Sequence, residues 1–199
     1  MLGHSMGSFL LRQYLGLYGD GISGAIVMGT GSKSNLLLTA GKVLCRIIAF
    51  GKGWEYRSKL VNNMAFGGFN KKFSQETNGS DWLSRNPVNS QKYAKDPLCS
   101  FVFTVNAYYQ MFCGILAVNH QEKNGKIPKT LPIFLVAGKD DPVGNFGKSV
   151  ENIYKNYKSC GIEDVSMKLY ENDRHEILNE VDRSLVFDDL LTWMEKQKR

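Results

Sequence analysis

The sequence predicts an α/β fold, in which a mainly parallel sheet with flanking helices is interrupted by a helical insertion. Three observations support this. Short apolar runs alternate with amphipathic helical patterns near both ends of the chain. The middle differs, being rich in Asn, Gly, Lys and aromatic residues. Finally, residues 3–7 read Gly-His-Ser-Met-Gly, a G-x-S-x-G pattern typical of a sharp strand-to-helix turn.

The first part of the chain, residues 1–31, is expected to form one piece of the α/β core. Apolar residues at positions 10, 11, 14, 15 and 18 follow helical spacing, and Gly19 suits the end of that helix. Residues 24–29 then form a short apolar run, typical of a buried strand. Only Met1 and Leu2 precede the turn, so the strand that should lead into it is expected to be cut short.

Residues 32–128 are predicted to be an inserted helical cap. Helical patterns cover about residues 36–50, 54–62 and 101–118. Turn-like pairs lie between them, among them Gly67-Gly68 and Asn86-Pro87. The α/β alternation returns in residues 129–199, the second piece of the core. It predicts a strand over 131–138, a helix over 146–157, a strand over 165–170 and a last helix over 186–194.

Composition and charge narrow the class of protein. The chain of 199 residues is 43% hydrophobic and 22% charged, which is ordinary for a globular protein with one sizeable core. Its net charge of +6 comes from scattered Lys and Arg, interpreted as a solvated face. We expect no nucleic-acid partner and at most peripheral membrane contact. The four cysteines are far apart, so we expect reduced thiols and a cytoplasmic location.

A serine on such a turn needs a base to accept its proton and a carboxylate to orient that base. The chain has three histidines. His4 is expected to support the turn and His120 lies in the insertion, whereas His175 follows the strand at 165–170 in a polar loop. The acid should follow the strand at 131–138, where Asp140 and Asp141 are adjacent. Their side chains point in different directions, so only one of them can meet the histidine.

The chain resembles the lid-containing α/β-hydrolases of the monoacylglycerol lipase, lysophospholipase and serine aminopeptidase group. The resemblance rests on the G-x-S-x-G turn, on Gly138-x-x-Asp141-Pro142-Val143 and on Asp173-Arg174-His175-Glu176. It selects Asp141 over Asp140 and implies a triad of Ser5, Asp141 and His175. It also implies an oxyanion hole that includes the backbone N–H of Met6, and no metal or cofactor.

The resemblance further implies that the chain is the C-terminal part of this fold, with the N-terminal strands and a second oxyanion donor missing. We therefore expect three remaining strands and poor folding and activity of the chain alone.

The expected substrate is a small carboxylic ester with a lipophilic acyl group, bound in a pocket that a subset of cap aromatics lines. One alternative is an aminopeptidase-like amide hydrolase, for which Glu55 or Glu76 would anchor an amine. Another is a non-catalytic remnant. The sequence says nothing about the oligomeric state.

Overall fold

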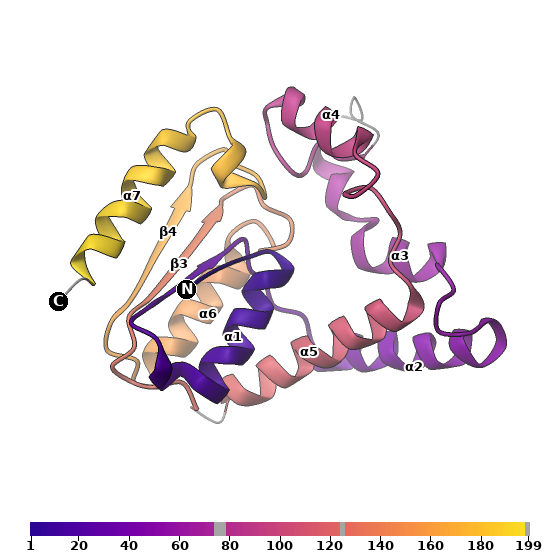
Figure 1. Cartoon of the computed structure of the whole chain (residues 1–199), viewed down its shortest axis with the longest axis horizontal. Coiled ribbons are helices and arrows are strands. Elements are labelled where there is room, and N and C mark those ends of the chain that lie inside the picture. The colour runs from indigo at the N-terminus through magenta and orange to yellow at the C-terminus, as the bar shows by residue number, and fades with distance from the viewer. Residues whose placement is uncertain (74–78, 124–125, 198–199) are drawn as a thin grey trace.

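A computed structural model describes residues 1–73, 79–123 and 126–197 (Figure 1). Its sheet holds four parallel strands in the order β1-β2-β3-β4. They are β1 (Leu2–His4), β2 (Ala25–Met28), β3 (Ile133–Gly138) and β4 (Val165–Tyr170). The strands are joined through α1 (Met6–Tyr18) and α6 (Lys148–Ser159), and α7 (Arg183–Lys196) ends the described chain. The predicted parallel α/β fold is confirmed.

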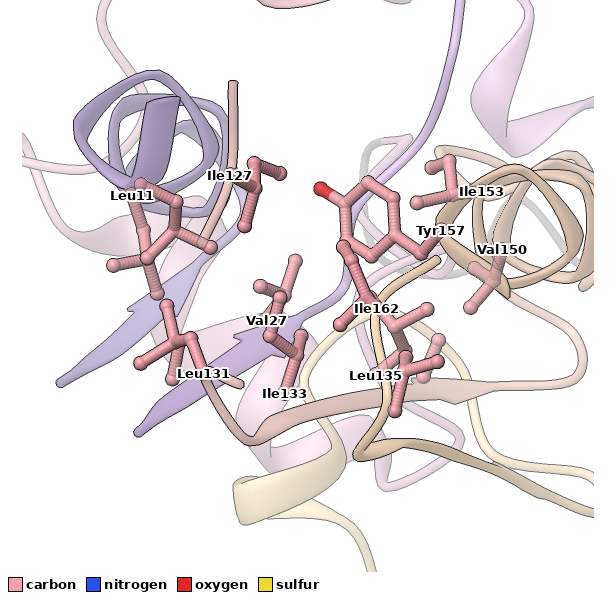
Figure 2. Packing of buried hydrophobic residues seen from close by; sticks show 14 residues of the cluster. Leu11, Val27, Ile127, Leu131, Ile133, Leu135, Val150, Ile153, Tyr157 and Ile162 are labelled. Atoms are coloured by element: carbon pink, nitrogen blue, oxygen red, sulfur yellow. The ribbon is translucent and has the colours of Figure 1, made fainter. Parts of the chain in front are cut away.

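Strand alternation divides the core between the two faces of the sheet. Val27, Ile133 and Leu135 point to one face, where they pack with residues of α1 and α6, among them Leu11 and Tyr157 (Figure 2). The neighbouring strand residues point to the other face and pack against α7. This second cluster comprises Ile26, Met28, Phe134, Val136, Tyr170, Ile177, Val186 and Leu190. Both faces of the central strands are therefore covered, as expected for parallel strands.

The start of the chain corrects the expectation of three strands. Although β1 is short, its residues pair in parallel register with Ile26, Val27 and Met28 of β2. The backbone N–H of Ile26 also bonds to the carbonyl of Met1, at 2.8 Å. Three residues suffice for a strand because the neighbouring β2 supplies the hydrogen-bond partners and α1 packs beside it. The sheet thus has a fourth strand that leads directly into the serine turn.

Between β2 and β3, the described residues form four α-helices: α2 (Asn35–Lys52), α3 (Lys59–Phe66), α4 (Pro87–Lys95) and α5 (Val105–Lys123). The long helices α2 and α5 pack side by side and extend away from the sheet (Figure 1). Gly41 permits this approach, because a Cβ there would lie 2.7 Å from Cε2 of Phe112. These elements fall within residues 32–128, whose treatment as a separate cap remains a prediction. None of the helices in the described ranges is long and apolar enough to cross a bilayer.

Two details of the insertion differ from the predicted elements. The helix expected from Trp54 begins only at Lys59, because the Ser58 side chain accepts the N–H of Val61 and caps α3 there. Asn86-Pro87, predicted as a turn, instead opens α4. Asn86 Oδ1 accepts the N–H of Val88 at 3.1 Å, and Pro87 takes the first helical position. Proline suits that position because its missing N–H is not needed there.

A buried ion pair fixes the end of the insertion to the core. Arg12 on α1 donates from Nε and Nη2 to the two carboxylate oxygens of Glu122 on α5, each at 2.8 Å. Arg12 also donates to Thr30 Oγ1 at 2.9 Å and to the carbonyl of Gly31 at 2.7 Å. The hydroxyl of Tyr157 on α6 donates to Glu122 as well. Burial alone would lower the pKa of Arg12, but Glu122 and Tyr157 outweigh it and raise that pKa.

Candidate active site

Ser5 occupies the turn between β1 and α1 in a conformation that side chains rarely adopt. Its φ is 53° and its ψ is −120°. Such a conformation costs about 1–3 kcal/mol and persists only where the surroundings enforce it. The backbone N–H of Ser5 donates to the carbonyl of Met28 at 3.0 Å, and its own carbonyl accepts the Ser8 hydroxyl at 2.5 Å. The turn is thus held by both the end of β2 and the first turn of α1.

The two glycines of the motif do not play the same part. A Cβ on Gly3 would lie 2.4 Å from the carbonyl oxygen of Gly7 and 2.9 Å from Cβ of Leu11, so only glycine fits there. A Cβ on Gly7 would meet no atom within 4 Å. Close packing therefore requires glycine at position 3, whereas Gly7 lies on α1 where space is open.

His175 and Asp141 meet at the ends of their strands. Nδ1 of His175 lies 2.9 Å from Oδ2 of Asp141, and both side chains are buried. The other oxygen of Asp141 accepts the N–H of Val143 at 2.8 Å, which fixes the carboxylate. Asp140 instead uses its backbone N–H to bond the carbonyl of Asp173, at 2.9 Å. Of the two adjacent aspartates, Asp141 is the one that reaches the histidine.

Two aromatic side chains lie against the His175 imidazole. The ring of His4 lies 4.8 Å from it and the ring of Trp82 lies 5.0 Å from it, centroid to centroid. Nε2 of His4 is 3.0 Å from the carbonyl oxygen of His175. Because a carbonyl only accepts, His4 carries its proton on Nε2. Burial, and then the neighbouring His175, lower the pKa of His4.

The loop around His175 is bound to residues 84–85 by a buried carboxylate. Glu180 accepts the backbone N–H of Arg174 at 3.0 Å, the backbone N–H of Arg85 at 3.0 Å and the Ser84 hydroxyl at 2.9 Å. These contacts join the loop after β4 to the segment before α4. The sequence offered no signal for the contacts with Ser84 and Arg85, which lie 96 and 95 positions before Glu180.

A second carboxylate, Asp173, is buried in the same loop. The Arg85 guanidinium lies 3.1 Å from Asp173 and 2.6 Å from Asp182. Burial, together with Asp182 and Glu180, raises the pKa of Asp173 to about 7. This environment was not predicted from the sequence, in which Asp173 is only one residue of the Asp173-Arg174-His175-Glu176 motif.

Ser5 and His175 line one cavity of about 560 Å³, together with Met6, whose backbone N–H lies at the start of α1. Helix N-termini leave such N–H groups without an intrahelical partner. Eight aromatic side chains from the described part of residues 32–128 line this cavity, namely Phe66, Phe69, Trp82, Tyr93, Phe101, Phe103, Tyr108 and Phe112. The acid among the lining residues is Glu176. Glu55 is exposed and does not line it, and Glu76 lies outside the described residues.

His120 sits on α5 and does not line this cavity. In the described ranges, no three His, Cys, Asp or Glu side chains gather in a way that could hold a metal ion.

The turn, the buried pair and the cavity agree with the comparison to known families. Residues 1–182 match the family described as serine aminopeptidase, S33. The chain belongs to this family of hydrolases. A search of curated protein sequences finds no match.

Solved structures give the same fold. A highly thermostable carboxyl esterase from Bacillus coagulans, in complex with glycerol, is 25% identical with a TM-score of 0.87. The match covers 98% of this chain and 64% of that one. A lipase in its open form is 24% identical with a TM-score of 0.84, covering 100% and 65%. A soluble variant of monoglyceride lipase from Saccharomyces cerevisiae, in complex with a substrate analog, is 20% identical with a TM-score of 0.69, covering 100% and 64%. The chain therefore spans 64–65% of the length of these structures.

Proposed function

We propose that this hydrolase is a serine esterase that cleaves carboxylic esters of lipophilic acyl groups, in the manner of a lysophospholipase or monoacylglycerol lipase. The observation that carries the proposal is the buried Asp141–His175 pair, which opens onto the same cavity as the strained Ser5. The aromatic lining of that cavity suits an acyl chain better than a charged group.

The mechanism follows from the protonation of His175. Because Nδ1 faces the acceptor Asp141, the neutral ring carries its proton on Nδ1, and Nε2 is left to accept the Ser5 proton. Ser5 Oγ then bonds to the ester carbonyl carbon, and the oxyanion receives the N–H of Met6. The C–O bond to the alcohol breaks as His175 returns the proton to the leaving oxygen. Water, deprotonated by His175, hydrolyses the acyl-serine and restores the free enzyme.

Covalent labelling tests the assignment of the nucleophile. A fluorophosphonate probe should modify Ser5 in the full chain, as identified by peptide mass spectrometry. Ser5→Ala and His175→Ala should abolish labelling and the hydrolysis of p-nitrophenyl octanoate, whereas Asp140→Asn, a control beside the acid, should retain both. Labelling at another serine would refute the assignment. A folded chain that is not labelled at all would favour the non-catalytic remnant.

An aminopeptidase-like reaction is a second candidate, because Glu176 places a carboxylate on the cavity wall next to His175. A carboxylate could pair with the free amine of an aminoacyl substrate. Comparing p-nitrophenyl esters with aminoacyl-anilides separates the two reactions. If the chain acts as an aminopeptidase, Glu176→Gln should lower kcat/KM for the anilides by about 10-fold or more and spare the esters.

A further inference from the structure

The outward face of α2 is an apolar surface that nothing in the described chain covers. Leu36, Val43, Ile47 and Phe50 recur at helical spacing along it, and their exposed fractions are 82%, 52%, 64% and 97%. The opposite face of α2, with Leu38, Cys45 and Ala49, is buried against α5 and its neighbours. Since a surface helix normally turns polar residues outward, α2 has one apolar face more than its packing requires. We call this outward set of four residues the α2 stripe.

Residues 32–73, the segment that includes α2, carry an excess of positive charge. Lys and Arg are scattered over the whole chain, but acidic residues are nearly absent from this segment. Residues 32–73 contain eight cationic side chains and one acid, Glu55, a net charge of +7 in a chain whose total is +6. The cations are Lys33, Lys42, Arg46, Lys52, Arg57, Lys59, Lys71 and Lys72. No ion pair joins any of them to an acid within the described ranges.

The helix that carries the α2 stripe also borders the cavity. Figure 1 shows α2 along an outer edge of the molecule, where a flat surface could reach it. Leu37 and Leu38 of the same helix line the cavity that holds Ser5. One helix thus presents an apolar, cationic face outward and two leucines to the cavity.

We propose that the α2 stripe docks on an anionic lipid surface. Apolar side chains of an interfacial helix enter the acyl boundary, while nearby Lys and Arg attract anionic headgroups. Pairing of two α2 stripes from two copies would instead bring two segments of net charge +7 together, which charge repulsion opposes. The role of docking in supplying substrate rests on the proposed esterase function, but docking itself does not.

Vesicle binding tests the proposal directly. Co-sedimentation of the full chain, carried out with Ser5→Ala so that hydrolysis plays no part, would use phosphatidylcholine vesicles with and without about 30 mol% phosphatidylglycerol. We expect binding to the anionic vesicles at least about 10-fold tighter than to the neutral ones, and weaker binding at high salt. Ile47→Ser/Phe50→Ser should lower the affinity for anionic vesicles by about 10-fold or more. Arg46→Gln/Lys52→Gln should lower it by about 10-fold.

The matched control is Phe187→Ser/Leu191→Ser on α7, whose side chains are 47% and 51% exposed. This double variant should bind vesicles like the parent protein, and circular dichroism should show that all variants are folded. The proposal is overturned if the parent does not bind anionic vesicles, or if Ile47→Ser/Phe50→Ser binds as tightly as the parent. It is also overturned if light scattering detects a dimer that this variant abolishes while vesicles bind neither protein. None of these readouts depends on ester cleavage, so the proposed function could fail and leave the docking result intact.

Discussion

Replacing Arg12 by methionine tests whether the buried ion pair secures the insertion to the core. The change removes both 2.8 Å bonds to Glu122 and the bonds to Thr30 and Gly31. Glu122 is then left as a buried carboxylate, 7% exposed, with Tyr157 as its hydrogen-bond donor. Breaking a buried pair from one side costs about 3–5 kcal/mol. For a chain of this size, about 2–4 °C is lost per kcal/mol, so Arg12→Met should lower the Tm by about 6–20 °C.

Urea unfolding followed by tryptophan fluorescence and far-ultraviolet circular dichroism measures this loss. Arg46→Met is the matched control, because Arg46 is exposed on α2 and should change the free energy of unfolding by about 0.5 kcal/mol or less. The double variant Arg12→Met/Glu122→Met removes both charges, so it should lose at least about 2 kcal/mol less than the sum of the single variants. A loss below about 1 kcal/mol for Arg12→Met, or strictly additive effects, would refute this account of the pair.

Glycine contacts and one buried carboxylate give three further tests. Gly3→Ala should lower the free energy of unfolding by about 3 kcal/mol, because its Cβ meets the Gly7 carbonyl. Gly7→Ala should leave that free energy unchanged or raise it by up to about 1 kcal/mol. Urea titrations that show the opposite order of stability would contradict this. Gly41→Ala displaces Phe112 on the cavity wall. The ratio of kcat/KM for p-nitrophenyl octanoate to that for p-nitrophenyl acetate should therefore fall about 10-fold. An unchanged ratio would exclude this contact as a determinant of the preferred acyl-chain length. Because the pKa of Asp173 is raised from 3.8 to about 7, its contribution to stability is fully present below pH 3.8 and is lost as the pH rises through about 7. The stability of the parent relative to Asp173→Asn should therefore fall as the pH rises from about 4 to about 7. A difference in thermal stability between the two proteins that stays constant over this range would disprove the prediction.

Local patterns explain which elements the sequence could predict. The strand predicted over residues 165–170 has the bounds of β4, because the apolar and polar positions alternate along it. Helix α4 was missed because its sequence is polar and buries only Ser90, so no apolar periodicity marks it. The available signal was the pair Asn86-Pro87, which suits a helix start as well as a turn.

The candidate site could likewise be predicted from the sequence only in part. Ser5 and the meeting of His175 with an aspartate could be anticipated, since each residue follows a strand and parallel strands end at one edge of the sheet. The choice of Asp141 over Asp140 came from the resemblance to the lid-containing α/β-hydrolases. Trp82 and Glu180 could not, because their contacts depend on how the insertion folds back over the sheet. Single sequences carry little information about such distant pairs.

The contacts of Glu180 limit how the insertion can be exchanged between related enzymes. Ser84 and Arg85 come from the insertion, yet they share one carboxylate with the loop that carries His175. A chimaera in which residues 32–128 are replaced as a block would lose the Ser84 and Arg85 donors to Glu180. The Glu180 carboxylate would then be buried in the loop of His175 without them. Recombination should preserve the segment around residues 81–86 together with the loop at 173–180, so that the two are inherited as one unit even though they lie far apart in the gene.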